Sequence, residues 1–172
     1  MKKVIFGEDH ATEEIAKTLI PKQVCSNIYR ASGISDVSRK METIHQNSLV
    51  IAIIDNDKKN IPGYFIQDFT VCFTFKDCYF VIKCNKGGTL HYIVVLSPAS
   101  DQWLRCCAEA VKITTEEYNL GTTLKEFTKV TKRTDLSDNP DFKRFIKATL
   151  KKESPAMSAL QNWMLDELKK YE

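Results

Sequence analysis

The strongest constraint on the fold is an uninterrupted apolar segment at residues 49–54 that ends on two aspartates. The segment contains no polar residue, is rich in β-branched side chains and is short. Such a run is typical of a strand that is buried on both faces of a parallel sheet. The sequence therefore predicts a central strand of an α/β fold, with Asp55 and Asp57 at its carboxyl end.

The two aspartates lie where α/β proteins bind their ligands, in the crevice beyond the carboxyl ends of the strands. Because side chains alternate along an extended backbone, Asp55 and Asp57 are expected to point to the same side. Two carboxylates suit Mg²⁺ or Mn²⁺ better than Zn²⁺. Aspartate also ends strands simply because it forms turns and caps helices, and this alternative stays open here.

A third acid follows another predicted strand near the start of the chain. Residues 2–7 form a short apolar strand, and residues 10–20 show the apolar spacing of a helix that ends before Pro21. Glu8 falls in the turn between them, whereas Asp9 suits the N-cap of the helix. If the two strands are neighbours in one parallel sheet, three carboxylates converge, and their mutual repulsion calls for a cation.

The rest of the chain predicts a mainly parallel sheet with an antiparallel hairpin at its edge, followed by helices. Before residue 120 we expect strands at 26–30 and 49–54, a loop or short helix at 60–70, a hairpin of residues 77–84 and 90–96, and helices at 34–46 and 99–113. Helices without strands follow at 124–131, 141–151 and 155–170. These patterns predict an α/β domain at residues 1–120 and a helical C-terminal extension at 121–172, packed on the same domain.

The order of a strand ending in Glu, a helix, a second strand and helix, and a strand ending in Asp-x-Asp resembles the Toprim domain. This domain is shared by topoisomerases, bacterial primases and the overcoming-lysogenization-defect nucleases. The matching segments are residues 4–13 and 53–57, and the resemblance covers roughly the first two thirds of the chain. It implies a three-layer, Rossmann-like fold in which Glu8 is a general acid or base and Asp55 and Asp57 coordinate Mg²⁺.

The last predicted strand and the helix at 99–113 that follows it are similar to the last strand and helix of small bacterial Toprim-like proteins of unassigned function. This likeness makes Asp101 a candidate for a further metal ligand, or for holding a metal-bound water. The alternative is that Asp101 complements the dipole at the N-terminus of its helix. Trp103 and Leu104 are expected in the core.

The six cysteines show no metal-binding pattern. Cys72, Cys78 and Cys84 are spaced evenly by six, and Cys106 and Cys107 are adjacent, but no Cys-x-x-Cys pair is present. We expect buried, reduced thiols that pack as small hydrophobic groups.

A nucleic-acid partner would depend on local basic clusters, because the chain has 25 Lys and Arg against 22 Asp and Glu. A solvated helix face is the alternative explanation for basic residues at helical spacing. The candidate phosphate contacts are Lys58 and Lys59 after the aspartates, Lys143, Arg144 and Lys147 in the tail, and a further tail cluster of Lys129, Lys132 and Arg133.

No apolar segment approaches the roughly 20 residues that a membrane span needs, and the start of the chain lacks the long apolar region of a signal peptide. We therefore expect a cytoplasmic protein without a membrane partner. A Walker-type loop, a Gly-x-Ser-x-Gly elbow and a His-Glu-x-x-His motif are also missing, which disfavours the enzyme classes that use them.

Two functions remain. The first is nuclease-like phosphodiester chemistry that depends on Mg²⁺ or Mn²⁺ at a Toprim-like carboxylate site. The second is a non-catalytic Toprim-like binding or assembly module that works with a partner protein such as an ATPase. A receiver-like fold, which also carries acids at strand ends, is the main alternative fold, although a hairpin and a helical tail depart from its repeating strand and helix units.

Overall fold

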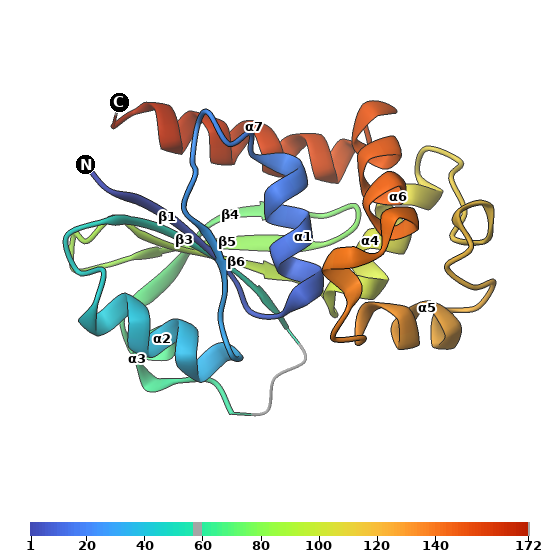
Figure 1. Cartoon of the computed structure of the whole chain (residues 1–172). Helices are drawn as coiled ribbons and strands as arrows, with labels where there is room; N and C mark the ends of the chain where they lie inside the picture. Colours follow the sequence, from blue (N-terminus) through green and yellow to red (C-terminus); the bar gives the residue numbers. More distant parts are fainter. Residues whose placement is uncertain (57–59, 172) are drawn as a thin grey trace.

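Short apolar strands and amphipathic helices alternate along the chain and produce an α/β fold (Figure 1). The computed structural model describes residues 1–56 and 60–171. The strands are β1 (Lys3–Gly7), β2 (Ile28–Arg30), β3 (Leu49–Asp55), β4 (Phe69–Phe75), β5 (Phe80–Asn85) and β6 (His91–Leu96). The helices are α1 (His10–Leu19), α2 (Ile34–Thr43), α3 (Gly63–Gln67), α4 (Ser100–Glu109), α5 (Leu124–Thr131), α6 (Pro140–Lys151) and α7 (Pro155–Lys169), with short 3-10 turns η1 (Glu116–Tyr118) and η2 (Leu136–Asp138).

The strands in the described part of the chain form one six-stranded sheet of order β2-β1-β3-β6-β5-β4. The four strands β2, β1, β3 and β6 are parallel, whereas β5 runs antiparallel to both β6 and β4. The predicted mainly parallel sheet with an antiparallel edge is therefore confirmed. The antiparallel β5 does not fit the five repeating strand and helix units of a receiver-like fold.

Strand β3 lies at the centre of the sheet, and all seven of its residues are buried. Leu49, Ile51 and Ile53 face one hydrophobic cluster together with α1, α4, α6 and α7. The alternate residues of β3 face a second cluster together with α2 and α3. The fold thus has three layers, and the uninterrupted apolar run reflects burial of β3 on both faces.

The C-terminal helices share a core with the sheet. Phe142, Phe145 and Leu160 belong to the same buried cluster as Ile5 of β1 and Ile15 of α1. Figure 1 shows α6 and α7 beside α1, on the face of the sheet opposite α2 and α3. The helices expected after residue 121 are present, and the aromatic side chains of α6 are buried in the core. None of the helices in the described residues is long and apolar enough to cross a membrane.

One strand was missed by the sequence-based prediction, which had a loop or short helix at 60–70 and no strand between residues 54 and 77. Residues 69–75 instead form β4, the outer strand of the sheet. The pairing with β5 shifts by one residue between Val71 and Phe73. Phe69 therefore packs with α3, whereas Phe73 and Phe75 contact Phe80 on the other face. Because the bulge interrupts the alternation, the segment lacks the simple period of a half-buried strand.

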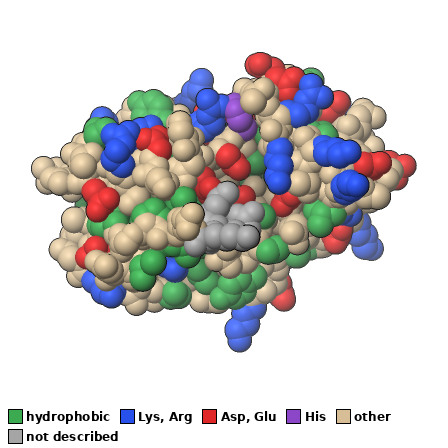
Figure 2. All heavy atoms as spheres, turned by 90° about the horizontal axis from the view of Figure 1, so that it is seen from below, with side chains coloured by type: hydrophobic (Ala, Val, Ile, Leu, Met, Phe, Trp, Pro, Cys, Tyr) green, Lys and Arg blue, Asp and Glu red, His purple; other side chains and the backbone are tan. Residues whose placement is uncertain are grey.

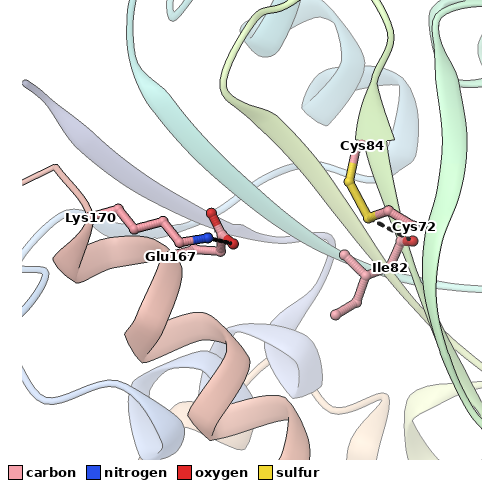
Figure 3. Close-up of a disulfide and its surroundings, with 5 residues drawn as sticks. All are labelled: Cys72, Ile82, Cys84, Glu167 and Lys170. Atoms are coloured by element: carbon pink, nitrogen blue, oxygen red, sulfur yellow. Dashed lines mark hydrogen bonds and ion pairs between the residues drawn. A yellow bond between two sulfur atoms is a disulfide. The ribbon is translucent and has the colours of Figure 1, made fainter.

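The prediction of reduced cysteines is wrong for four of the six. Cys72 and Cys84 form a disulfide between β4 and β5 (Figure 3), and Cys78 and Cys106 form a second one between the β4–β5 turn and α4. Spacing along the chain does not reveal which cysteines are close across strands and layers, and a disulfide depends on that proximity. The Cα–Cα distances of 6.0 and 5.5 Å suit such bonds. The two remaining cysteines are buried thiols, as expected (Cys25 and Cys107).

A buried polar network joins β6 to the turn after α2 and to α3. The ring Nε2 of His91 donates to the carbonyl oxygen of His45 at 2.9 Å, and the Tyr64 hydroxyl donates to Nδ1 at 2.8 Å. This pattern uses the neutral form of His91. Burial lowers the pKa of both histidines below the ordinary value of 6.5, and neighbouring Lys2 lowers that of His45 further.

Because both histidines are neutral when buried, the stability of the fold should depend on pH. Below pH 6.5 the unfolded chain binds more protons at His45 and His91 than the folded chain does, so the free energy of unfolding should fall as the pH drops from about 6.5 to about 5. The slope should reach up to about 1.4 kcal/mol per pH unit for each histidine. Urea unfolding across this range measures it. His91→Gln, which cannot titrate, should give a shallower slope, and an unchanged slope would contradict the assignment.

Gly7 is required by close packing between β1 and α1. A Cβ atom at this position would lie 2.3 Å from the backbone nitrogen of Glu13 and 2.6 Å from its Cα. Both atoms belong to the backbone of α1, so they cannot move aside like a flexible side chain. Gly63 provides the contrast, because the nearest atom to its Cβ would be the Gln67 side-chain nitrogen at 3.8 Å.

We therefore predict that Gly7→Ala lowers the free energy of unfolding by about 1–3 kcal/mol, since it forces α1 away from the strand end. Gly63→Ala is the matched control and should change it by less than about 0.5 kcal/mol. Chemical denaturation of both variants measures the difference. Equal stabilities of the two variants would show that the close contact at Gly7 relaxes without cost.

Candidate functional site

Glu8 follows β1 directly and lies against the end of β3, the neighbouring parallel strand. Its backbone N–H donates to the carbonyl oxygen of Ile53 at 3.1 Å, and its side-chain Oε2 accepts the backbone N–H of Asp55 at 2.9 Å. Both acids are buried, with 3% of Glu8 and 8% of Asp55 exposed. The structure thus brings Glu8 and Asp55 together at the carboxyl edge of the sheet.

Asp55 is also linked to the start of α4. Its Oδ1 accepts the backbone N–H of Ser100 at 2.8 Å. This contact arises because β6 is the neighbour of β3 on its other side, and α4 begins shortly after β6 ends. The end of the central strand is therefore held from both sides, by Glu8 after β1 and by Ser100 after β6.

Asp101, the next residue of α4, joins this helix to α5. Its Oδ2 accepts the Thr128 hydroxyl at 2.5 Å, and its Oδ1 accepts the backbone N–H of Gln102 at 2.7 Å. Asp101 is 8% exposed and lies in the first turn of α4, where an acid complements the helix dipole. The side chain of Asp101 therefore has a structural role at the junction of α4 and α5.

Asp55 and Asp101 line one polar pocket of about 200 Å³, the carboxylate pocket, whereas Glu8 is not among its lining residues. Most of its lining residues carry a carboxylate or a hydroxyl group, and the exposed Lys132 lies at its edge. The lining residues are Asp9, Asp55, Ala99, Ser100, Asp101, Gln102, Thr128, Thr131 and Lys132. Figure 2 views the molecule from the side of α2 and α3, and acidic and basic side chains lie close together near the middle of this face.

The donor types in this pocket suit a hard cation. Mg²⁺ binds oxygen ligands, usually with one or two carboxylates and several waters, and Asp55 and Asp101 offer two carboxylates. Among the residues that the structure describes, no group of three or more His, Cys, Asp or Glu lies close enough together to hold a metal ion. Asp57, the other predicted ligand, lies outside the described residues.

The predicted phosphate contacts fall in three places. Lys58 and Lys59 lie outside the described residues. Lys143, Arg144 and Lys147 lie on α6, and Arg144 forms an ion pair with Asp141. None of these three belongs to the described lining of the carboxylate pocket, whereas Lys132 of the other predicted basic cluster does.

Part of the site was not predicted as such. Thr128, Thr131 and Lys132 form the α5 side of the pocket, and the Ser100 backbone supplies a donor to Asp55. Lys132 had a signal in the sequence, because it belongs to a basic cluster, but its position beside the acids depends on how α5 packs against α4. A backbone N–H is present in every residue except proline, so the sequence does not show which one donates to Asp55.

A wider hollow of about 710 Å³ lies between α2 and the segment before α3. Its charged lining residues are Arg39 and Glu42, and Arg39 also pairs with Asp36. No acid at a strand end contributes to it. The carboxylate pocket is therefore the better candidate for chemistry, because it combines buried acids from separate elements at the ligand-binding edge of the sheet.

Comparisons of this chain with protein-family models, with curated proteins and with solved structures found no match.

The contact between Asp101 and Thr128 generates the next prediction. Thr128→Val removes the hydroxyl donor and leaves a nearly buried carboxylate without that hydrogen bond, so it should lower the free energy of unfolding by about 1–2 kcal/mol. Thr134→Val, at an exposed position, is the control and should cost less than about 0.5 kcal/mol. Denaturant unfolding of both proteins makes the comparison. Two equally stable variants would contradict a structural role for the contact.

Proposed function

We propose that this chain carries a Toprim-like site that binds Mg²⁺ or Mn²⁺ and uses it in nuclease-like phosphodiester chemistry on nucleic acid. The observation that carries the proposal is the hydrogen-bonded chain from Glu8 through Asp55 to Ser100, beside Asp101, at the carboxyl edge of β1, β3 and β6. It supports the family resemblance, since a glutamate after the first strand and an aspartate at the end of the central strand become direct neighbours.

Each acid has a distinct role in this proposal. Asp55 and Asp101, together with Asp57, would hold the cation, which supplies charge stabilisation at a phosphodiester. Glu8 moves a proton. Its carboxylate is held in one orientation by the Asp55 backbone N–H, so it is positioned before substrate arrives. Lys132, exposed at the edge of the pocket, supplies positive charge for a substrate phosphate.

Nucleic acid is the proposed substrate because basic side chains extend beyond the pocket. Lys58 and Lys59 follow the aspartates in the sequence, and Lys143, Arg144 and Lys147 lie on α6. Such a substrate would place the chain in the cytoplasm, where thiol reductants keep most cysteines reduced. The disulfides Cys72–Cys84 and Cys78–Cys106 count against this cytoplasmic part of the proposal.

A non-catalytic module that works with a partner protein, such as an ATPase, is the second candidate. The observation that favours it is the structural use of the same acids. Asp55 accepts the Ser100 N–H and Asp101 accepts the Thr128 hydroxyl, so these side chains already link α4 to β3 and to α5.

Two conservative variants test the enzymatic proposal. Asp55→Asn and Glu8→Gln each keep an oxygen that can accept the existing backbone N–H while removing the charge, so both should fold. Asp55→Asn should weaken Mn²⁺ binding at least about tenfold, because it removes an ionised ligand. Glu8→Gln should slow cleavage about a hundredfold or more with little change in Mn²⁺ affinity. Calorimetry with Mn²⁺ and cleavage of labelled DNA and RNA measure these effects.

The exposed Glu116→Gln is the matched control and should change neither measurement. The enzymatic proposal is wrong if the wild-type protein neither binds Mn²⁺ or Mg²⁺ nor cleaves any nucleic acid. If in that case a partner protein is retained equally by the wild type and by both carboxylate variants, the assembly module is the better account.

A further inference from the structure

The outer strand β4 has an open edge. It is the last strand of the sheet, and in the described part of the chain only β5 pairs with it. Five of its seven residues are exposed, among them Val71 at 53% and Phe73 at 38%. An open strand edge presents unpaired backbone N–H and C=O groups to any extended segment that approaches. The opposite edge is different, because β2 has only three residues.

The sequence of β4 lacks two of the usual protections of such an edge. Natural edge strands commonly carry a charged residue or a proline, and Phe69–Phe75 contains neither. Its aromatic side chains lie on both faces, because the bulge at Cys72 separates Phe69 from Phe73 and Phe75. The disulfide from Cys72 to Cys84 fastens β4 to β5 (Figure 3), so the edge is held in place.

Two opposite charges flank the uncharged strand. Asp68 directly precedes β4 and Lys76 directly follows it, and both are exposed. Neither forms an ion pair with another residue that the structure describes. When two identical strands pair antiparallel, the start of each lies beside the end of the other. Asp68 of one copy would then lie near Lys76 of the second copy, and symmetry provides this contact twice.

We propose that β4 pairs antiparallel with β4 of a second copy of this chain and joins the two sheets. The two sides of such an interface are identical, so it closes as a dimer and leaves only the short β2 edges outside. The pairing would cover Val71 and Phe73 and satisfy the open backbone groups of both strands. The inference is independent of the proposed chemistry, because β4 contributes no residue to the carboxylate pocket.

A charge exchange tests this pairing. Analytical ultracentrifugation of the full chain should give a mass of twice 19.7 kDa for the wild type. Lys76→Glu and Asp68→Lys each replace two attractive contacts by two repulsive ones, so each should raise the dimer dissociation constant about tenfold. The double variant Asp68→Lys/Lys76→Glu restores opposite charges at both ends and should recover the wild-type value.

Two further variants complete the experiment. Val71→Lys places a charge in the middle of the edge at an exposed position, so it should give a folded monomer. Lys22→Glu makes the same charge change as Lys76→Glu on an exposed loop and should leave the dimer intact. A wild-type protein that is monomeric at high micromolar concentration overturns the proposal. So does a dimer that tolerates Val71→Lys and both single charge variants.

Discussion

The rest of the structure depends on the burial of β3 on both faces. Residues 49–54 of β3 carry no polar side chain and have to be covered from both sides, and the two hydrophobic clusters that cover them include residues from every α-helix of the described chain. Its backbone groups also need partners on both edges, and β1 and β6 supply them in parallel register. Parallel neighbours end at the same edge of a sheet. The convergence of Glu8, Asp55 and Ser100 therefore follows from the same constraint that makes the core.

The helices and strands that were predicted correctly are those whose local sequence pattern matches their burial in the fold. The run at residues 49–54, the helix after Asp9 and the proline-initiated helices of the tail each carry a signal within a few residues, and each is present in the structure. The pairing of Glu8 with Asp55 needed one additional assumption, that the first and third strands are neighbours. The sheet order satisfies it.

The elements that were missed depend on contacts between distant segments. Strand β4 has a bulge that interrupts its alternation, and the disulfide partners Cys78 and Cys106 are 28 residues apart in the chain. Lys132 reaches the pocket only because α5 packs against α4, a contact that Asp101 and Thr128 help to define. The tail thus forms a wall of the candidate site, which periodicity alone does not reveal.

The disulfide between Cys78 and Cys106 makes the β5 and β6 side of the sheet harder to open locally than the β2 edge. It closes a covalent loop that contains β5, β6 and the start of α4, and the Trp103 indole donates to the carbonyl oxygen of Cys78 inside the same loop. Fraying of the outer hairpin is therefore restrained by the helix whose first residue holds Asp55. We therefore expect the amide protons of β5, β6 and α4 to exchange as one cooperative unit, and those of the three-residue β2, at an edge without a crosslink, to exchange more readily.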